Sequence, residues 1–323
     1  MTILRHTLTF LLAFGIIWII SGLIIGAVDR IARRYNRSAF AVAFFTLGIL
    51  TSISEISVAF NSVIEGVPQI SAGNLAGASV VIFFLIIPLL ALGARSIDLN
   101  HSIRWSMLVL TLCVIAAPSL VALDGIVLPT EGILLILLYC MLIMRIRSKQ
   151  ATSRVADHPM TDIRSELIAG KHATLRDALA IFGGAVLIFF AGNMLVDESV
   201  YFSGLLNVPA SLAGLLILSI GTNTPELILA FRSILSKHTE IAFGDYLGSA
   251  AANTLIFGFL PIANGAFTLN TSEFAASFFV LTFGLSLFAL FARTKNTLSR
   301  RESVVLLALY TCFLVAQIGT IFR

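Results

Sequence analysis

The feature that most constrains this chain is a series of ten apolar runs, each long enough to cross a membrane. The runs cover residues 8–28, 39–64, 69–93, 102–122, 126–144, 176–196, 208–232, 240–263, 271–292 and 303–321. A helix needs roughly 20 residues to cross the hydrocarbon core of a bilayer, whereas strands of a membrane barrel would be alternating segments of about 10. Because backbone polar groups in lipid must be paired internally, we predict ten transmembrane helices.

Composition supports a membrane protein. The chain has 323 residues, of which 58% are hydrophobic and only 12% charged, and its mean hydropathy is +0.99. A soluble domain carries about a quarter charged residues because it must cover a water-facing surface. The first run could be a signal peptide, but no A-x-A cleavage pattern follows it and the positive flank 29–34 would resist translocation. We therefore expect a retained helix.

The basic residues indicate orientation rather than nucleic-acid binding. If the N-terminus is outside, 19 of the 21 Lys and Arg residues fall in inside loops, and only Arg5 and Arg323 fall outside. Cytoplasmic loops carry such an excess of basic residues. We therefore predict that both termini lie outside. The polar stretch 145–175 is then a cytoplasmic linker between helices 1–5 and 6–10.

The chain contains an internal repeat. When it is compared with itself at an offset of 171 residues, ten of 31 positions between 47–77 and 218–248 are identical, without gaps. Because each half holds an odd number of helices, the second copy enters the membrane from the opposite side. Inverted repeats of this kind are characteristic of secondary transporters, which bind substrate near the midplane and alternate access around it.

The predicted architecture is therefore an all-α membrane protein of two inverted five-helix repeats. The first repeat covers residues 1–144 with core helices 39–93, and the second covers 176–323 with core helices 208–263. The linker 145–175 joins them.

Glu55 and Glu226 are paired by the repeat and lie deep inside apolar runs. An unpaired charge there costs at least about 2.5–3.5 kcal/mol on insertion scales. No Lys or Arg lies near either glutamate within its run. Protonation, mutual hydrogen bonding or bound cations remain as ways to stabilise them, and two structural, protonated glutamates are the simplest alternative to a site.

Oxygen-bearing side chains surround both glutamates in the sequence. Four residues before each lies a threonine, Thr51 or Thr222, and three residues before each lies Ser52 or Asn223. In a continuous helix such residues share a face with the glutamate. A membrane Ser or Thr otherwise bonds its own backbone carbonyl.

Two further features favour a cation site in the second repeat. Pro225 breaks its helix beside Glu226, which frees backbone carbonyls that can line a cavity. Asp245, Ser249 and Asn253 recur every four residues and form a polar stripe toward the core. The matched stripe in the first repeat is Asn74, Ala78 and Ile82, which loses its polarity with depth.

The candidate ligands are all oxygens. Such a set suits hard cations rather than soft metals, and Ca²⁺ and Na⁺ are favoured over Mg²⁺, which gives up its water reluctantly. Two carboxylates balance one divalent ion, or two monovalent ions or protons, as an exchanger requires. The three cysteines, Cys113, Cys140 and Cys312, show no metal-ligand spacing or disulfide framework, and we expect them to be small buried apolar residues.

These motifs resemble those of the Ca²⁺/cation exchanger superfamily, and most of all the prokaryotic sodium/calcium exchangers. That family pairs G-T-S-x-P-E with G-N-x-x-G-S-N in each repeat. The second copy here reads GTNTPE at 221–226 and GDYLGS at 244–249, and the first reads LTSISE at 50–55 and GNLAG at 73–77. The motifs cover about 75 residues, and the helix layout extends the resemblance to the whole chain.

The resemblance implies a Ca²⁺ and Na⁺ site and a prokaryotic-type inner (plasma) membrane. It implies that these ions bind alternately to Glu55 and Glu226, aided by Thr51, Ser52, Thr222 and Ser249. This chain departs from the family at Ser54, where the pattern has proline, and at Ala78, which replaces a coordinating serine. Ile82 stands where the family has a polar residue, and Asn253 stands where the family often has a different polar residue. We therefore expect the second repeat to supply most of the remaining ligands.

Several functions stay open at this point. Exchange of Ca²⁺ for Na⁺ leads, with exchange of Ca²⁺ or another cation for H⁺ as the alternative. A cation channel would need a continuous pore. If the protein were a membrane scaffold, Glu55→Gln and Glu226→Gln would not change Ca²⁺ binding. We find no nucleophile–base pair or phosphate loop, so we predict no enzyme and no cofactor beyond the transported ions. The expected partners are inorganic cations and the lipid bilayer, and the expected assembly is a monomer.

Overall fold

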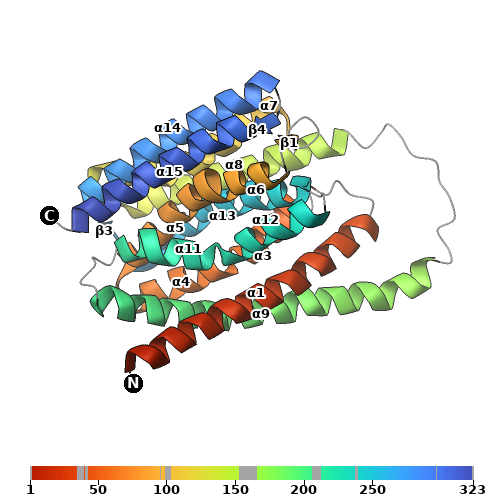
Figure 1. Cartoon of the computed structure of the whole chain (residues 1–323), viewed down its shortest axis with the longest axis horizontal. Coiled ribbons are helices and arrows are strands. Elements are labelled where there is room, and N and C mark those ends of the chain that lie inside the picture. The colour runs from red at the N-terminus through yellow and green to blue at the C-terminus, as the bar shows by residue number, and fades with distance from the viewer. Residues whose placement is uncertain are drawn as a thin grey trace.

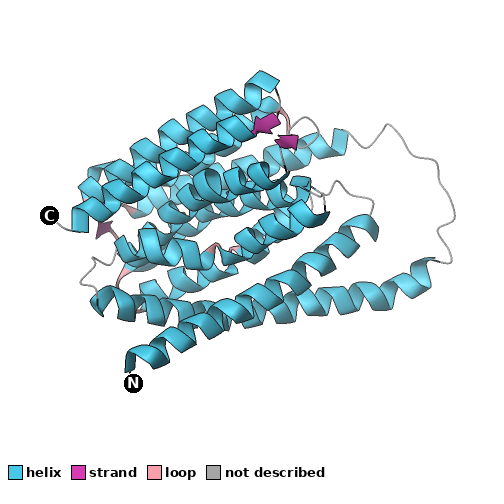
Figure 2. Cartoon of the chain, viewed as in Figure 1, coloured by secondary structure: helices cyan, strands magenta, loops and turns pink. Residues whose placement is uncertain are grey.

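Helices make up nearly all of the described chain, and they follow the predicted apolar runs closely (Figure 2). The computed structural model describes residues 2–34, 40, 43–94, 96–98, 103–152, 166–205, 212–236, 239–295 and 297–321. Most helices run along a common direction in one bundle, and two long ones lie at one side of it (Figure 1).

Among the described residues, the first half of the chain forms five helical stretches. They are α1 (Thr2–Arg34); η1 (Ala43–Leu47), α3 (Gly48–Thr51) and α4 (Ile53–Ile64); α5 (Pro68–Val81), η2 (Ile82–Ile86) and α6 (Ile87–Ala94); α7 (Trp105–Val121) with η3 (Ala122–Asp124); and α8 (Pro129–Thr152). The segments η1 and η2 are π-helical, and η3 is a 3₁₀ turn.

The second half repeats this order. It consists of α9 (Glu166–Leu205); the π-helical η5 (Ala213–Leu218), α11 (Ser219–Thr222) and α12 (Thr224–Ser236); α13 (Thr239–Asn264); α14 (Thr271–Lys295); and α15 (Arg300–Ile321). Helices α8 and α9 extend into the predicted linker 145–175 from both sides, and residues 153–165 between them lie outside the described part.

Length and hydropathy mark many of these helices as membrane spans. Among the described residues, seven helices are long and apolar enough to cross a membrane, and nine spans result if each of two bent pairs counts as one. The bent pairs are Ala43–Thr51 with Ile53–Ile64, at 41°, and Gly214–Thr222 with Thr224–Leu235, at 51°. The chain is therefore a mostly helical, polytopic membrane protein.

The two bent pairs correspond to each other residue by residue. Adding 171 to the bounds of α3 gives the bounds of α11, and the breaks fall at Ser52 and Asn223. The sequence predicted a break only in the second half, at Pro225. The first half breaks as well, although Ser54 takes the place of that proline. The prediction that each threonine shares a helix face with its glutamate is therefore wrong for both pairs, because a break separates Thr51 from Glu55 and Thr222 from Glu226.

Two short strand pairs, which the hydropathy pattern did not predict, join the halves through their loops. Strand β1 (Ser96–Asp98) pairs with β4 (Thr297–Ser299), and β2 (Ile126–Val127) pairs with β3 (Phe267–Thr268), both antiparallel. Each pair joins a loop of the first half to a loop of the second. The pairs hold the ends of the surrounding helices in register because their backbone groups bond across the two halves.

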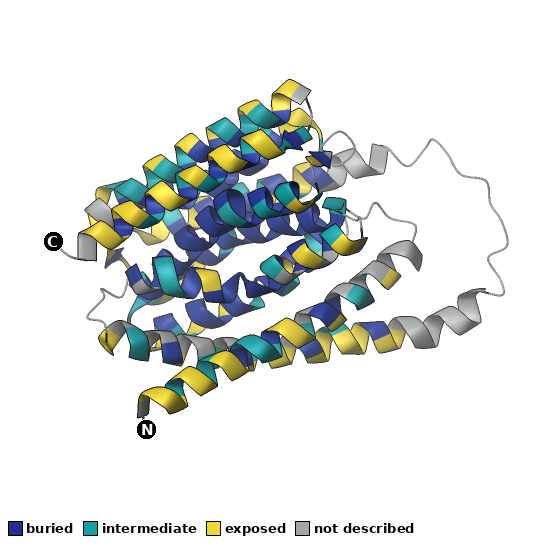
Figure 3. Cartoon of the chain, viewed as in Figure 1, coloured by how far each residue is buried: buried dark blue, intermediate teal, exposed yellow. Residues whose placement is uncertain are grey.

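The core lies around α5 and α13, which are buried along most of their length (Figure 3). Small residues allow these helices to approach the bent spans closely. A Cβ on Gly77 would lie 2.2 Å from the carbonyl oxygen of Leu215, and a Cβ on Gly248 would lie 2.3 Å from that of Phe44. These contacts are equivalent under the 171-residue offset, and each packs a helix of one half against the bent span of the other.

The three cysteines correct one expectation. Cys113, Cys140 and Cys312 are exposed on the protein surface rather than buried. Hydropathy alone could not separate the two cases, because a surface that faces lipid is as apolar as the protein interior.

Candidate functional site

The two glutamates lie just beyond the two helix breaks. Glu55 is in the first turn of α4 and Glu226 is in the first turn of α12, and neither has any exposed surface. The breaks bring backbone carbonyls and side-chain oxygens of both bent spans to the same buried region. Helices α5 and α13 close this region with further polar side chains.

Glu226 is held by the second half and by the joint of the first. The hydroxyl of Ser249 on α13 donates to Glu226 Oε1 at 3.0 Å. The Oγ atoms of Ser249 and Ser52 lie 3.2 Å apart, within hydrogen-bonding distance. Tyr246 donates from its hydroxyl to the carbonyl oxygen of Glu226 at 3.1 Å. One chain of contacts thus joins α12, α13 and the break between α3 and α4.

Glu55 is held differently, by its own neighbour in the chain. Ser54 donates to Glu55 Oε2 at 2.9 Å, and the same hydroxyl lies 3.1 Å from the carbonyl oxygen of Thr51 and 3.2 Å from that of Thr222. A hydroxyl has one proton to donate. The Ser54 hydroxyl can therefore donate fully to only one of these three oxygens at a time.

A pair of crossed contacts ties each bent span to the opposite half. The Thr51 hydroxyl lies 3.0 Å from Asp245 Oδ1 and 3.0 Å from the carbonyl oxygen of Leu47, and Thr222 donates to Asn74 Oδ1 at 3.2 Å. The two crossed contacts are equivalent under the 171-residue offset. They differ in charge, because the second half has a carboxylate where the first has an amide.

Several buried oxygens in this region have no hydrogen-bond partner among the described residues. They are Glu55 Oε1, Glu226 Oε2, Asp245 Oδ2, Asn223 Oδ1 and Asn253 Oδ1. Leaving a buried polar atom unpaired costs about 1–3 kcal/mol, and more when it is charged. Carboxylate and amide oxygens are the ligands that hard cations such as Ca²⁺ and Na⁺ take.

The acidic groups do not form a site on their own. Within the described part of the chain, no group of three or more His, Cys, Asp or Glu side chains is placed to hold a metal ion. Calcium takes six to eight oxygens. A cation here would need hydroxyl and carbonyl oxygens beside the carboxylates, as the broken helices offer.

The sequence-predicted residues fall into two groups. Hydrogen bonds link Glu55, Glu226, Thr51, Ser52, Thr222, Ser249 and Asp245 into this region. Asn223 donates through its amide nitrogen to the carbonyl oxygen of Ser219, at 2.6 Å, and leaves its own oxygen unpaired. Asn253 is buried in the same stripe, with no partner in the described part.

The site prediction missed three residues that the structure places in the region: Ser54, Asn74 and Tyr246. Asn74 could have been included in the prediction, because it is the equivalent of Asp245 in the first repeat. Ser54 stands where the family pattern has proline, so the pattern suggested a loss rather than a hydrogen-bond donor.

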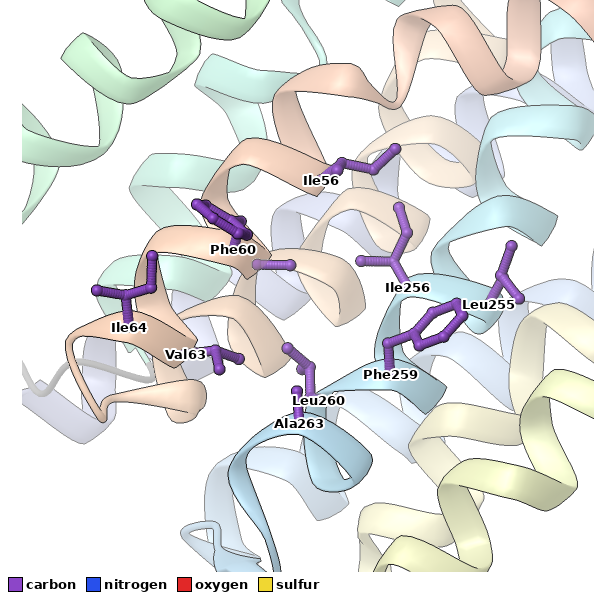
Figure 4. A pocket seen from close by; sticks show the side chains of 10 residues that line it. Ile56, Phe60, Val63, Ile64, Leu255, Ile256, Phe259, Leu260 and Ala263 are labelled. Carbon is purple, nitrogen blue, oxygen red and sulfur yellow. The ribbon is translucent and has the colours of Figure 1, made fainter.

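A separate groove of about 400 Å³ lies between α4 and the last turns of α13 (Figure 4). Its lining consists of Ile56, Ala59, Phe60, Val63, Ile64, Leu255, Ile256, Phe259, Leu260 and Ala263. All of these side chains are apolar, so the groove offers no oxygen ligand. It lies beside the helix that carries Glu55 but is no part of the polar region.

Fold and site together define an integral membrane protein that carries a buried, oxygen-lined acidic centre between two bent spans. Buried ionisable residues in such a place mark ion pathways and transport sites. The family model of the sodium/calcium exchanger protein matches residues 5–146 and 177–319. The chain belongs to this sodium/calcium exchanger family, a family of membrane transporters, and its function is cation exchange.

Individual relatives agree with this assignment. The sodium/calcium exchanger MaX1 of Methanosarcina acetivorans is 29% identical over 142 residues, which cover 43% of this chain and 40% of that protein. The inner membrane protein YrbG of Escherichia coli is 23% identical over 93% of both chains. A solved structure of the sodium-calcium exchanger NCX_Mj has a TM-score of 0.73 and 21% identity, covering 98% of this chain and 99% of that one. The last likeness shows a shared fold.

Proposed function

We propose that this protein exchanges Ca²⁺ for Na⁺ by alternating access around a site with Glu55 and Glu226 near the membrane midplane. One observation carries the proposal: two buried carboxylates at equivalent positions follow the breaks of two bent spans, and each has one oxygen without a partner in the described part. A bound cation would supply the missing partner for both.

The proposed topology is ten helices in two inverted repeats with both termini outside an inner (plasma) membrane of prokaryotic type. The 171-residue correspondence of α3 with α11 and the distribution of basic residues support it. Under this topology the strand pair β1–β4 lies inside and β2–β3 lies outside. We infer that the transporting unit is a monomer, because both bent spans belong to one chain.

Exchange against H⁺ is the second candidate, and a difference between the two halves favours keeping it. Glu226 accepts a hydrogen bond from the Ser249 hydroxyl. The residue equivalent to Ser249 in the first half is Ala78, whose side chain has no oxygen. Na⁺ needs oxygen ligands, whereas a proton needs only the carboxylate. A first half that is poorer in ligands is therefore compatible with either counter-ion.

Flux measurements in proteoliposomes separate these candidates. We expect ⁴⁵Ca²⁺ uptake into liposomes loaded with Na⁺ and little uptake into liposomes loaded with choline at the same pH. Uptake that ignores the Na⁺ gradient and follows an imposed pH gradient would replace Na⁺ with H⁺ as the counter-ion. Fast passive flux without any counter-ion would indicate a channel instead.

Glutamine variants test the two carboxylates. Glu55→Gln and Glu226→Gln remove one charge each at nearly constant size. Losing a residue that only hydrogen-bonds to a metal ligand typically costs about 10–100-fold in affinity or activity, so we expect each variant, which loses a direct ligand, to reduce Ca²⁺ uptake by more than that. Glu65→Gln is the matched control, because Glu65 is an exposed glutamate at the end of α4. Wild-type Ca²⁺ binding in both buried variants would refute the site.

A further inference from the structure

The two long helices α1 and α9 pack against each other along one side of the bundle (Figure 1). Their middle contact is apolar and includes the fully buried Ala13, Ile17 and Ala191. Polar contacts occur on either side of this middle, one near the start of α1 and one near its end. In lipid, helices associate through close packing and interhelical hydrogen bonds, so these polar contacts add to the apolar packing of the pair.

The contact near the start of α1 centres on a histidine. His6 Nδ1 donates to Glu198 Oε2 at 2.6 Å, and the ring of His6 stacks on that of Tyr201 with centroids 3.6 Å apart. The side chains of His6 and Glu198 are 18% and 9% exposed. A carboxylate and an aromatic face both favour a cation between them, so this pocket suits an imidazolium.

The contact near the end of α1 centres on an arginine. Arg30 donates to Asp177 Oδ1 from Nε at 3.0 Å and from an Nη atom at 2.8 Å. The Asp177 side chain is 2% exposed. A guanidinium stays charged at every pH that a protein tolerates, so acid or base within that range leaves its charge unchanged.

The two contacts occupy equivalent positions in the repeat. The 171-residue offset carries His6 onto Asp177 and Arg30 onto Tyr201. Each contact therefore joins the first part of one helix to the last part of its equivalent. The two contacts therefore have equivalent positions but different chemistry. One centres on the imidazole of His6 and the other on the permanently charged guanidinium of Arg30.

We infer that α1 and α9 are clasped to each other at both ends, and that the His6 clasp alone responds to external pH. Its placement outside rests on the proposed topology. Histidine is the side chain that ordinarily changes charge between about pH 5 and 8. When His6 is protonated, a charge-assisted bond to Glu198 and a cation on Tyr201 hold the helices together. When it is neutral, the hydrogen bond to the Glu198 carboxylate remains, but the attraction between opposite charges and the cation on Tyr201 are lost.

Other titratable groups lie at the same end. Arg5 Nη2 is 3.5 Å from His6 Nε2, and Asp197 interacts electrostatically with Glu198. Arg5 disfavours a second positive charge beside it, whereas the two acids favour one. Glu198 makes the direct bond to His6, so a positive charge on the His6 ring tightens the clasp.

Spin-label distances test the clasp directly. Labels at Leu4 and Leu205, which are 64% and 51% exposed, report the His6 end, and labels at Leu23 and Leu179, which are 60% and 62% exposed, report the Arg30 end. We expect the ratio of close to separated His6-end labels to fall about fivefold when external pH rises from about 5.5 to about 8.5, because the attraction between opposite charges and the cation on the Tyr201 ring are lost. The Arg30-end ratio should stay constant.

Two variants make the result decisive. His6→Gln keeps a donor toward Glu198 but has no charge at any pH, so its His6-end distances should not change with pH. Asp177→Asn should loosen the Arg30 end at both pH values and leave the pH response of the His6 end intact. A pH response that survives His6→Gln, or a wild-type protein without one, overturns the inference. The distances need no transport, so failure of Ca²⁺ exchange would leave this test standing.

Discussion

Ala78 marks the main difference between the two halves of the candidate site at the scale of single residues. Its equivalent, Ser249, bonds to Glu226 and contacts Ser52, whereas Glu55 relies on Ser54. The hydrogen bonds of the two glutamates are therefore asymmetric, whereas the prediction that the second half supplies most of the cation ligands stays a prediction. Ser54 partly offsets this difference between the halves. Its hydroxyl donates to Glu55 from a position where the family pattern has proline, which has no side-chain oxygen.

Restoring the missing hydroxyl should strengthen cation binding. Ala78 is fully buried on α5, and Ala78→Ser adds one oxygen at the position that Ser249 occupies in the other half. A neutral hydrogen bond contributes about 0.5–1.5 kcal/mol, so we expect Ca²⁺ affinity to rise about 2- to 10-fold, measured by calorimetry in detergent. Ala76→Ser, on another face of α5, is the control and should not raise it. Equal affinities for wild type and Ala78→Ser would argue that this position does not face the cation.

At the scale of elements, the bent spans depend on close backbone packing against α5 and α13. A methyl group on Gly77 or Gly248 would overlap a carbonyl oxygen of η5 or η1, and backbone in a buried helix cannot easily move aside. Overpacking of this kind typically costs about 1–3 kcal/mol. The close approach of the two bent spans to α5 and α13 therefore depends on these two glycines.

Alanine variants test this coupling. Gly77→Ala and Gly248→Ala should each lower the thermal unfolding temperature of the purified protein, followed by fluorescence-detected size exclusion after heating. Gly183→Ala is the control, since an added Cβ there would meet no atom within 4 Å in the described part of the chain. It should leave the temperature unchanged or raise it, because alanine favours a helix. If all three variants unfold alike, the close approach does not limit stability.

At the scale of the whole molecule, the inverted arrangement predicts which loops face each side. Single cysteines at Asp124 and Arg300, both exposed, should report opposite sides of the membrane. In a background without the three native cysteines, an impermeant maleimide added to intact cells should label position 124 and spare position 300 until the cells are opened. Labelling in the reverse order would place both termini inside.

The apolar runs, the repeat and the paired glutamates could all be predicted from the sequence, because each depends on local composition or on comparison of the chain with itself. The described helices match the predicted runs to within a few residues at most ends. The predicted pairing of Glu55 with Glu226 agrees with their equivalent places after the two breaks.

Only the tertiary structure decided the rest. The break at Ser52, the roles of Ser54 and Asn74, and the strand pairs depend on contacts between residues far apart in the chain. The sequence also could not predict which side chains are buried, because lipid and the protein interior are both apolar. The exposed cysteines, for example, lie in runs as hydrophobic as the core. A membrane sequence thus specifies where its helices cross, but the oxygens that meet between two broken helices are set by how those helices pack.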